Sequence, residues 1–203
     1  MSPTLAVRSY GDRAVLVETD ESFVLPVARA LLALDGVSEV VPAARTVLAR
    51  IDPARLTQVT ITRALRRASA DDAVDQWDDP VLIEVTYDGP DLGLVAADAG
   101  CSPAEVIQRH SAPTYTVAFC GFSPGFAYLT GLHPSLVQPR LATPRARVPA
   151  GAVAIAAGYT AAYPQSSPGG WRLLGRTDAA LWDTARVSPS LLRPGDRVRF
   201  VSA

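Results

Sequence analysis

Glycine and proline are concentrated in the second part of this 203-residue chain. Of the 14 glycines, 12 follow residue 88, and 12 of the 17 prolines do so as well. Both residues are common in turns and weaken the interior of long helices. Short apolar runs between so many turn formers predict a mainly-β barrel or sandwich. Because the composition changes at residues 87–90, we expect two domains, residues 1–86 and 87–203.

The first of these domains alternates between strand and helix patterns. Residues 14–17 are typical of a short strand, and apolar residues recur at i, i+3, i+4 and i+7 over residues 27–34, as on one face of a helix. The remaining expected elements are strands at 37–41 and 46–51, a helix from Asp52-Pro53 to about residue 69, and a strand at 81–85. The order βαββαβ predicts a ferredoxin-like α+β domain. An acidic segment at residues 71–79 is expected to be a solvated loop rather than a metal site.

The charged residues exclude several classes of protein. The formal net charge is −1, which argues against a nucleic-acid partner, and all 19 basic residues are arginine. Without lysine the chain has neither a P-loop nor a Schiff-base lysine. His110 and His133 lack metal-ligand spacing, so we predict no metal site. No signal peptide or membrane span is expected, and two cysteines without a CxxC pair suit the cytoplasm.

Residues 91–106 are similar to a helix-turn-helix. Asp91 can cap a first helix, and Ser102 with Glu105 forms a capping box that opens a second one. A DNA-reading helix presents basic and amide side chains at its N-terminal end. This one presents Glu105 there and Arg109 only near its end, so we expect a structural helix pair.

The most distinctive motif is Gly121-Phe122-Ser123-Pro124-Gly125-Phe126-Ala127-Tyr128-Leu129. Its first five residues match the G-x-S-x-G pattern of the hydrolase nucleophile elbow. That elbow needs a backbone N–H on the residue after the serine, and Pro124 has none. Ser123 is therefore not expected to be a nucleophile.

Two more motifs follow. They are Arg140-Leu141-Ala142-Thr143-Pro144-Arg145-Ala146-Arg147-Val148-Pro149-Ala150-Gly151 and Tyr163-Pro164-Gln165-Ser166-Ser167-Pro168-Gly169-Gly170-Trp171, the latter closing on Leu174-Gly175-Arg176-Thr177. Together the three blocks resemble the family called allophanate hydrolase subunit 1, KipI-like, or the B subunit of 5-oxoprolinase. The resemblance is strong over residues 80–203 and weak before them. Members commonly have Gln before the Thr in the segment preceding Tyr-Pro, where this chain has Tyr159 before Thr160.

The resemblance implies a cyclophilin-like β-barrel for the second domain and a function in bacterial ATP-dependent 5-oxoprolinase. That enzyme converts 5-oxo-L-proline to L-glutamate with ATP hydrolysis. Its other components would be a KipA-like C subunit, in direct contact, and a LamB/YcsF-like A subunit. We expect ATP to be used by the complex and no cofactor to be bound by this chain alone. The alternatives are a Kip-type inhibitor of a sensor histidine kinase and a component of a urea carboxylase or allophanate hydrolase system.

The prolines around Arg140 and Arg145 stiffen the backbone, and a planar guanidinium binds carboxylates with two parallel hydrogen bonds. Substrate binding and surface charge pairing are both open for these two arginines, and surface pairing is favoured for Arg147. The amide of Gln165, beside Tyr163, can bind a lactam or urea-like group. We therefore assign Tyr163 and Gln165 to the substrate site as well.

Phe122, Phe126 and Tyr128 are expected to line the mouth of a substrate pocket, with core packing as the alternative. His110 is the candidate general acid–base, because its pKa normally lies near neutrality. A structural histidine is the alternative. Cys120 is expected to be a buried thiol rather than a nucleophile.

Overall fold

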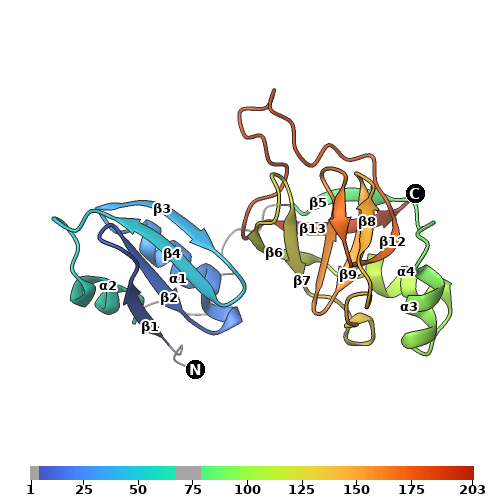
Figure 1. Cartoon of the computed structure of the whole chain (residues 1–203), viewed down its shortest axis with the longest axis horizontal. Coiled ribbons are helices and arrows are strands. Elements are labelled where there is room, and N and C mark those ends of the chain that lie inside the picture. The colour runs from blue at the N-terminus through green and yellow to red at the C-terminus, as the bar shows by residue number, and fades with distance from the viewer. Residues whose placement is uncertain (1–4, 67–78) are drawn as a thin grey trace. The chain divides into compact units, whose positions relative to one another are not determined.

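The computed structural model describes residues 5–66 and 79–203, and the chain divides into two compact units between residues 77 and 78 (Figure 1). The N-terminal unit is a four-stranded antiparallel sheet of order β1-β2-β4-β3 with helices packed on one face. Its elements are β1 Ala6–Ser9, β2 Ala14–Glu18, a 3-10 turn at Glu21–Phe23, α1 Val24–Leu32, β3 Val37–Pro42, β4 Thr46–Ile51 and α2 Gln58–Leu65. Alternate residues of β2 and β4 are buried against these helices, as the period of a strand requires: Val15, Val17, Val47 and Ala49.

The strand predicted at residues 81–85 is present, but its predicted place in the N-terminal sheet is wrong. That segment is β5 (Val81–Val85), and it pairs in parallel with β13 (Arg197–Ser202) of the second unit. The edge of the N-terminal sheet beside β2 is occupied by β1 instead. The predicted boundary at residue 86 therefore lies too late. The alternating apolar residues of β5 indicate a half-buried strand, but this pattern does not specify which sheet the strand joins.

Helix α2 begins later than expected. Its N-cap is Thr57, whose hydroxyl accepts from the backbone N–H of Thr60 at 3.2 Å. Asp52 instead accepts from the N–H of Ala54 at 3.0 Å, in the turn before the helix. The expected continuation over residues 67–69 lies outside the described residues, as does the acidic segment up to residue 78.

The second unit is built on a seven-stranded sheet of order β12-β9-β10-β7-β6-β13-β5. All neighbouring strands are antiparallel except β13 and β5. Besides β5 and β13, the elements are α3 Leu92–Asp98, α4 Pro103–Ser111, β6 Tyr115–Cys120, β7 Ala127–Thr130, a 3-10 turn η3 at Pro134–Leu136, β8 Arg145–Val148, β9 Ala152–Ala156, β10 Tyr159–Ala162, β11 Ser167–Gly169 and β12 Arg172–Arg176. Strands β8 and β11 form a separate two-stranded sheet.

The two outermost strands of the large sheet meet, so the sheet is nearly a closed barrel. Thr86, directly after β5, exchanges two backbone hydrogen bonds of 2.9 Å with Arg176 of β12. Gly89 N–H donates to Leu174 at 3.0 Å just beyond. A Cβ atom on Gly175 would lie 2.3 Å from the Thr86 carbonyl oxygen, so only glycine allows this approach. The mainly-β barrel predicted from the turn-rich composition is confirmed.

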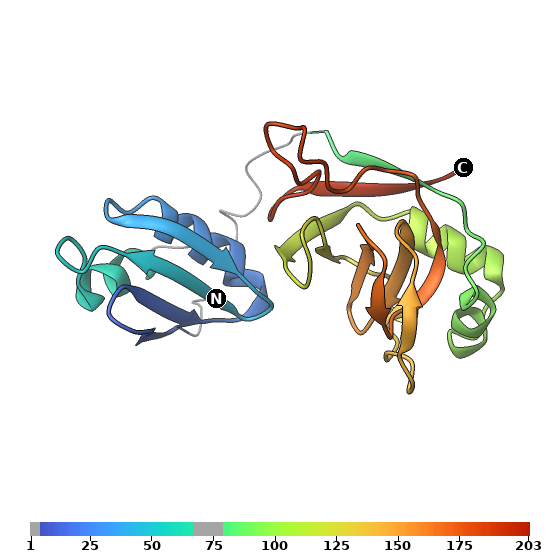
Figure 2. The same cartoon turned by 45° about the horizontal axis from the view of Figure 1, so that its top comes forward.

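Both faces of the sheet are covered, which explains the continuous burial of β9. Val153 and Ile155 point into a core shared with α3 and α4, whereas Ala152, Ala154 and Ala156 point into a second core rich in aromatic residues. The helices α3 and α4 lie side by side at one end of this unit (Figure 2). The candidate site is built on the aromatic face.

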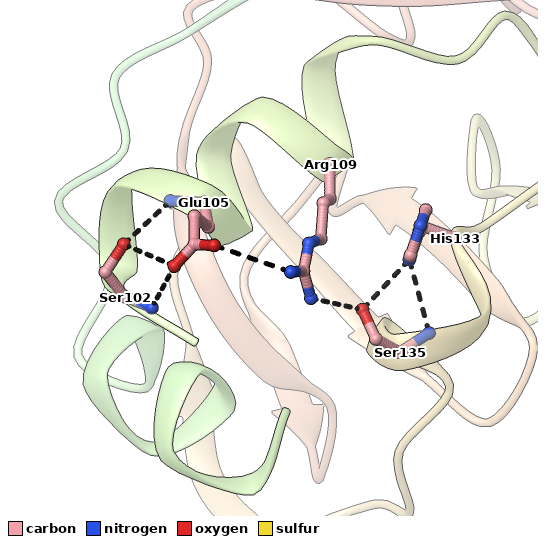
Figure 3. A network of polar contacts seen from close by, with 5 residues as sticks. All are labelled: Ser102, Glu105, Arg109, His133 and Ser135. Carbon is pink, nitrogen blue, oxygen red and sulfur yellow. Dashed lines mark hydrogen bonds and ion pairs between the residues drawn. The ribbon is translucent and has the colours of Figure 1, made fainter. Parts of the chain in front are cut away.

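The capping box predicted at the start of α4 is present and belongs to a longer polar network (Figure 3). Ser102 Oγ accepts from the Glu105 N–H, and the Glu105 carboxylate accepts from the Ser102 N–H at 2.8 Å. Glu105 also pairs with Arg109 at 3.6 Å, and Arg109 donates to Ser135 Oγ at 2.9 Å. The single arginine of α4 thus ties the helix to η3, consistent with a structural helix pair.

Within residues 5–66 and 79–203, no helix combines the length and the apolar character needed to cross a membrane.

Candidate functional site

An aromatic cluster lies at the centre of the second core. Phe126 is its hub, with ring centroids 5.0 Å from Tyr128, 5.1 Å from Tyr163, 5.3 Å from Phe122 and 5.6 Å from Trp171. These contacts are edge-to-face, the geometry that aromatic quadrupoles favour. The structure therefore brings Tyr163 together with three residues of the first motif, Phe122, Phe126 and Tyr128. Phe126 and Tyr163 are buried in this core, which favours the core-packing alternative for these two side chains.

The turn at residues 121–126 presents one member of this cluster to solvent. Phe122 has a φ of +71° and a side chain that is 63% exposed, whereas Phe126 is 1% exposed. A left-handed φ at a bulky residue is strained and is often found at functional sites. The turn is held by hydrogen bonds from Phe126 N–H to Ser123 and from Gly121 N–H to Phe126, at 3.0 and 3.1 Å. The turn leads from β6 into β7 and not into a helix, unlike a nucleophile elbow, and its strained aromatic was not predicted from the sequence.

Arg145 is the most firmly held arginine of the site. It opens β8, and its Nη2 lies 2.7 Å from Oδ1 of Asp91. The second oxygen of Asp91 accepts from the Leu173 N–H at 2.7 Å, and the Asp91 side chain is only 8% exposed. The Arg145 side chain remains 28% exposed. A buried carboxylate bound at both oxygens thus orients the guanidinium of a partly exposed side chain.

Arg140 and Arg145 both act on the Tyr163 hydroxyl. Burial raises the pKa of Tyr163, and the positive charges of Arg140 and Arg145 oppose that rise. Arg140 has the same opposing effect on the pKa of Tyr128, which burial also raises. Arg147 differs, because it is exposed and donates from Nε to Ser166 Oγ at 3.0 Å. The charges of Arg140 and Arg145 thus both affect the pKa of Tyr163, whereas Arg147 pairs with a serine at the surface.

Buried polar atoms without hydrogen-bond partners mark the same region. Within the described chain there are four such side-chain atoms, and three of them are Ser123 Oγ, Arg145 Nη1 and Ser167 Oγ. The fourth, Thr19 Oγ1, belongs to the N-terminal unit. Leaving a buried donor or acceptor unpaired costs about 1–3 kcal/mol, so such atoms are rare without a functional reason. Three of the four such atoms therefore lie on the sequence motifs around Tyr163.

Three residues of this region were not assigned to the substrate site from the sequence. Ser123 was considered only as a nucleophile, and Ser167 was not assigned to the substrate site. Asp91 was expected to cap α3, but its carboxylate makes no cap hydrogen bond and binds Arg145 and Leu173 instead. Because Asp91 lies 54 residues before Arg145, no local pattern links the two.

His110 does not join this site. It is fully buried in the other core, stacked on Phe200 at 4.7 Å. The Thr160 hydroxyl donates to the Ala154 carbonyl, so it accepts from His110 Nε2–H at 2.8 Å, and His110 Nδ1 accepts from the Tyr87 hydroxyl at 2.7 Å. Burial lowers the pKa of His110 to about 3.

Alternation along β10 separates His110 from the arginines. Thr160, the hydrogen-bond partner of His110, and Ala162 point towards the core that contains α3 and α4. Ala161 and Tyr163 point towards the aromatic cluster. A neutral, buried imidazole on the opposite face argues against the predicted general acid–base role and favours the structural alternative.

The two remaining candidate residues are Gln165 and Cys120. Gln165 is exposed, and its proposed contact with a substrate stays a prediction. Burial raises the pKa of the Cys120 thiol to about 11, as expected for a thiol that is not a nucleophile. Among the residues that the structure describes, no group of three His, Cys, Asp or Glu side chains could hold a metal ion.

Comparison with known proteins agrees with this architecture. Residues 5–192 match the family model of the carboxyltransferase domain, subdomain C and D. The chain is 40% identical to the 5-oxoprolinase B subunit of Escherichia coli O157:H7, over 94% of this chain and 93% of that protein. The crystal structure of TTHA0988 matches 95% of this chain with a TM-score of 0.79 and 39% identity, and the chain spans only 40% of that longer protein.

A more distant structure shares the fold alone. The Kluyveromyces lactis urea carboxylase matches 99% of this chain with a TM-score of 0.67 at 21% identity, and the match covers 22% of that protein. The family model and the 40% identity over nearly the whole length of both proteins carry the assignment. The chain belongs to the family of 5-oxoprolinase B subunits.

Proposed function

We propose that this chain is the B subunit of a 5-oxoprolinase, which converts 5-oxo-L-proline to L-glutamate with ATP hydrolysis. The observation that carries the proposal is the group of unpartnered polar atoms, Ser123 Oγ, Arg145 Nη1 and Ser167 Oγ, on the motifs around Tyr163. 5-Oxoproline offers a lactam carbonyl, a lactam N–H and a carboxylate, and these are the partners that hydroxyls and guanidinium groups require. In the net reaction water opens the lactam C–N bond, and a second water cleaves ATP to ADP and phosphate.

Within this function, Arg140 and Arg145 bind the polar groups of the substrate. Phe122, Phe126, Tyr128 and Tyr163 form its apolar surroundings, since small-molecule sites are mostly apolar with few polar groups. Gln165, at the exposed end of the Tyr163 segment, contacts the substrate or a partner protein. His110 stabilises the barrel and takes no part in proton transfer.

The chain acts in a complex and is inactive alone. Its partners are a KipA-like C subunit, in direct contact, and a LamB/YcsF-like A subunit. ATP is used by the complex, because this lysine-free chain has no phosphate-binding lysine and no P-loop. The length of TTHA0988, of which this chain spans 40%, supports the need for a further domain. We place the complex in the cytoplasm, where the free Cys101 and Cys120 stay reduced.

The finer description of the fold is also a proposal. The N-terminal unit corresponds to a ferredoxin-like sheet in which β1 takes the edge position expected for the last strand. The second unit corresponds to a cyclophilin-like barrel closed at Thr86 and Arg176.

The competing proposal is that the chain is a component of a urea carboxylase or allophanate hydrolase system. The carboxyltransferase family model and the shared fold with urea carboxylase favour this candidate. The chain cannot itself carry biotin, since biotin is attached to a lysine and the chain has none. Its arginine-rich site would also suit a carboxylated urea.

Deleting the gene distinguishes the candidates. If the chain is part of a 5-oxoprolinase, the deletion strain accumulates 5-oxoproline and loses growth on it as a nitrogen source, while growth on urea is unchanged. Complementation with the intact gene restores both properties. Normal 5-oxoproline levels in a strain without a redundant enzyme, or a growth defect on urea alone, would reject the proposal.

A further inference from the structure

We propose that Asp91 is a positioning residue that turns Arg145 into a charge-neutralised donor for the uncharged lactam carbonyl, and that Arg140 binds the substrate carboxylate. This inference rests on the proposed function and assigns the two arginines, which share one region, to different groups of the same substrate. It also adds a residue that lies outside the three sequence motifs.

The first step of the argument is that Asp91 is held rigidly. Its Oδ1 lies 2.7 Å from Arg145 Nη2, and its Oδ2 accepts from the Leu173 N–H at 2.7 Å. The side chain is 8% exposed. A carboxylate fixed at both oxygens by a strand backbone and a guanidinium has one conformation, and it transmits that conformation to Arg145.

The second step concerns charge. Asp91 and Arg145 together carry no net charge, so the pair attracts an anion less than a free guanidinium does. Arg140 is exposed and forms no ion pair with any residue in the described parts of the chain. A carboxylate therefore gains more from Arg140, whereas Arg145 offers a fixed N–H donor suited to a neutral carbonyl oxygen.

The third step is the direction of the free hydrogen bonds. Arg145 Nη1 has no acceptor, while Ser123 Oγ and Ser167 Oγ can each donate or accept. A lactam has one acceptor and one donor, which a guanidinium N–H and a hydroxyl group can satisfy. Nη1 itself is buried, while the Arg145 side chain as a whole is 28% exposed, so in this proposal a small side-chain shift gives a ligand access to Nη1.

The decisive variant is Asp91→Asn in the reconstituted complex. Asparagine keeps an oxygen for the Leu173 N–H but removes the negative charge and places an amide near Arg145. Asp88→Asn is the matched control, since Asp88 pairs with Arg176 at an exposed site, with side chains 49% and 58% exposed. Arg147→Ala is the control for the arginines, because Arg147 is exposed and bonded to Ser166.

We expect Asp91→Asn and Arg145→Ala each to lower kcat by about tenfold or more with little change in melting temperature. In the double variant, Asp91→Asn should add almost nothing to Arg145→Ala, because a positioning residue acts only through the group it positions. Arg140→Ala should mainly raise KM for 5-oxoproline. The role of Asp91 would be overturned if the two fold-losses in kcat multiplied in the double variant. It would also be overturned if Asp88→Asn lowered kcat as much as Asp91→Asn does.

Binding gives a readout that does not need turnover. The probes are 5-oxoproline and 2-pyrrolidinone, the same lactam without its carboxylate, measured on the complex by ligand-observed NMR. Arg140→Ala should weaken 5-oxoproline only, whereas Arg145→Ala and Asp91→Asn should weaken both probes. If Arg145→Ala weakens 5-oxoproline alone, the assignment of the two arginines is wrong.

The two proposals can fail separately. The expected binding pattern in a wild-type complex without 5-oxoproline turnover would reject the proposed function and support the division between Arg140 and Arg145. If the wild-type complex turned over 5-oxoproline but the fold-losses in kcat multiplied in the double variant, the inference would be rejected and the proposed function would stand. Binding of neither lactam would reject both.

Discussion

At the scale of single residues, burial fixes the protonation state of His110. The imidazole lies fully buried between Tyr87 and Thr160, and both ring nitrogens are hydrogen-bonded in the neutral form. Desolvation penalises the cation and lowers the pKa of His110 to about 3, whereas an unfolded histidine titrates near its ordinary value of about 6.5. Below that value the unfolded chain binds more protons than the folded one.

This difference predicts the direction of a pH effect on stability. The free energy of unfolding should be unaffected by this group above pH 6.5 and should fall by roughly 1 kcal/mol per pH unit below it. Urea unfolding at pH 7.5, 6.5 and 5.5 measures the slope. His110→Gln should be less stable at pH 7.5 but should show a flatter dependence between pH 6.5 and 5.5. A wild-type chain with no loss of stability over that interval would contradict the structural role given to His110.

Sequence analysis identified the motifs that meet in the fold but missed contacts between residues far apart in the chain. Phe122 and Phe126 contact Tyr163, and the charges of Arg140 and Arg145 affect its pKa. Asp91 was missed because its partner Arg145 is 54 residues away, and His110 was misassigned because its burial depends on Thr160, 50 residues away. The residues next to a histidine in the sequence do not show whether it will contact a carboxylate in the fold or be buried against a threonine.

At the scale of elements, barrel closure depends on a glycine. A Cβ on Gly175 would lie 2.3 Å from the carbonyl oxygen of Thr86 and 2.9 Å from the Cα of Tyr87. Both contacts are to backbone, which cannot move without breaking the paired hydrogen bonds between Thr86 and Arg176. The closure therefore leaves no space for a side chain at this position.

Gly175→Ala should accordingly destabilise the chain by about 1–3 kcal/mol, as overpacking does. Gly158→Ala is the matched control, because a Cβ there has no neighbour within 4 Å. Urea unfolding of both variants measures the difference. Similar stability for the two variants would show that strand β12 does not approach residue 86 as closely as described.

The partner of β5 gives a second prediction for elements. The fragment 79–203 retains β5, whereas the fragment 87–203, which starts at the boundary expected from composition, loses it. Losing β5 removes the buried Ile83 and Val85 from the core and leaves β13 with an unpaired edge. We expect cooperative thermal unfolding for 79–203 and aggregation or non-cooperative unfolding for 87–203. Equal cooperativity of both fragments would place β5 outside the barrel unit.

Strand β5 also shows what sequence patterns leave open. Its alternation predicted a strand at the right residues, and the helix caps at Ser102 and the turn-rich barrel were predicted from local residue types. The choice of sheet depends on which unpaired strand edge is available, and that is a property of the folded chain. The short β1, with only four residues and two exposed positions, gave no sequence signal for the edge it fills.

At the scale of the whole molecule, the chain consists of two units with separate cores, and the candidate site belongs to the barrel unit. The proposed site would offer arginine and hydroxyl groups to a substrate, and the lysine-free sequence has no P-loop to hold ATP phosphates. In the proposed function, partner proteins therefore supply the ATP site. We expect activity to depend on those partners.

The most direct measurement is ATP hydrolysis in a reconstituted system. The chain should co-elute with the KipA-like partner on size exclusion, and addition of the LamB/YcsF-like partner should give ADP and glutamate only when 5-oxoproline is present. The chain alone, and each pair that lacks the third protein, should show no 5-oxoproline-dependent hydrolysis. Robust 5-oxoproline-dependent ATP hydrolysis by the purified single chain, or a complete complex that responds to urea and not to 5-oxoproline, would contradict the account.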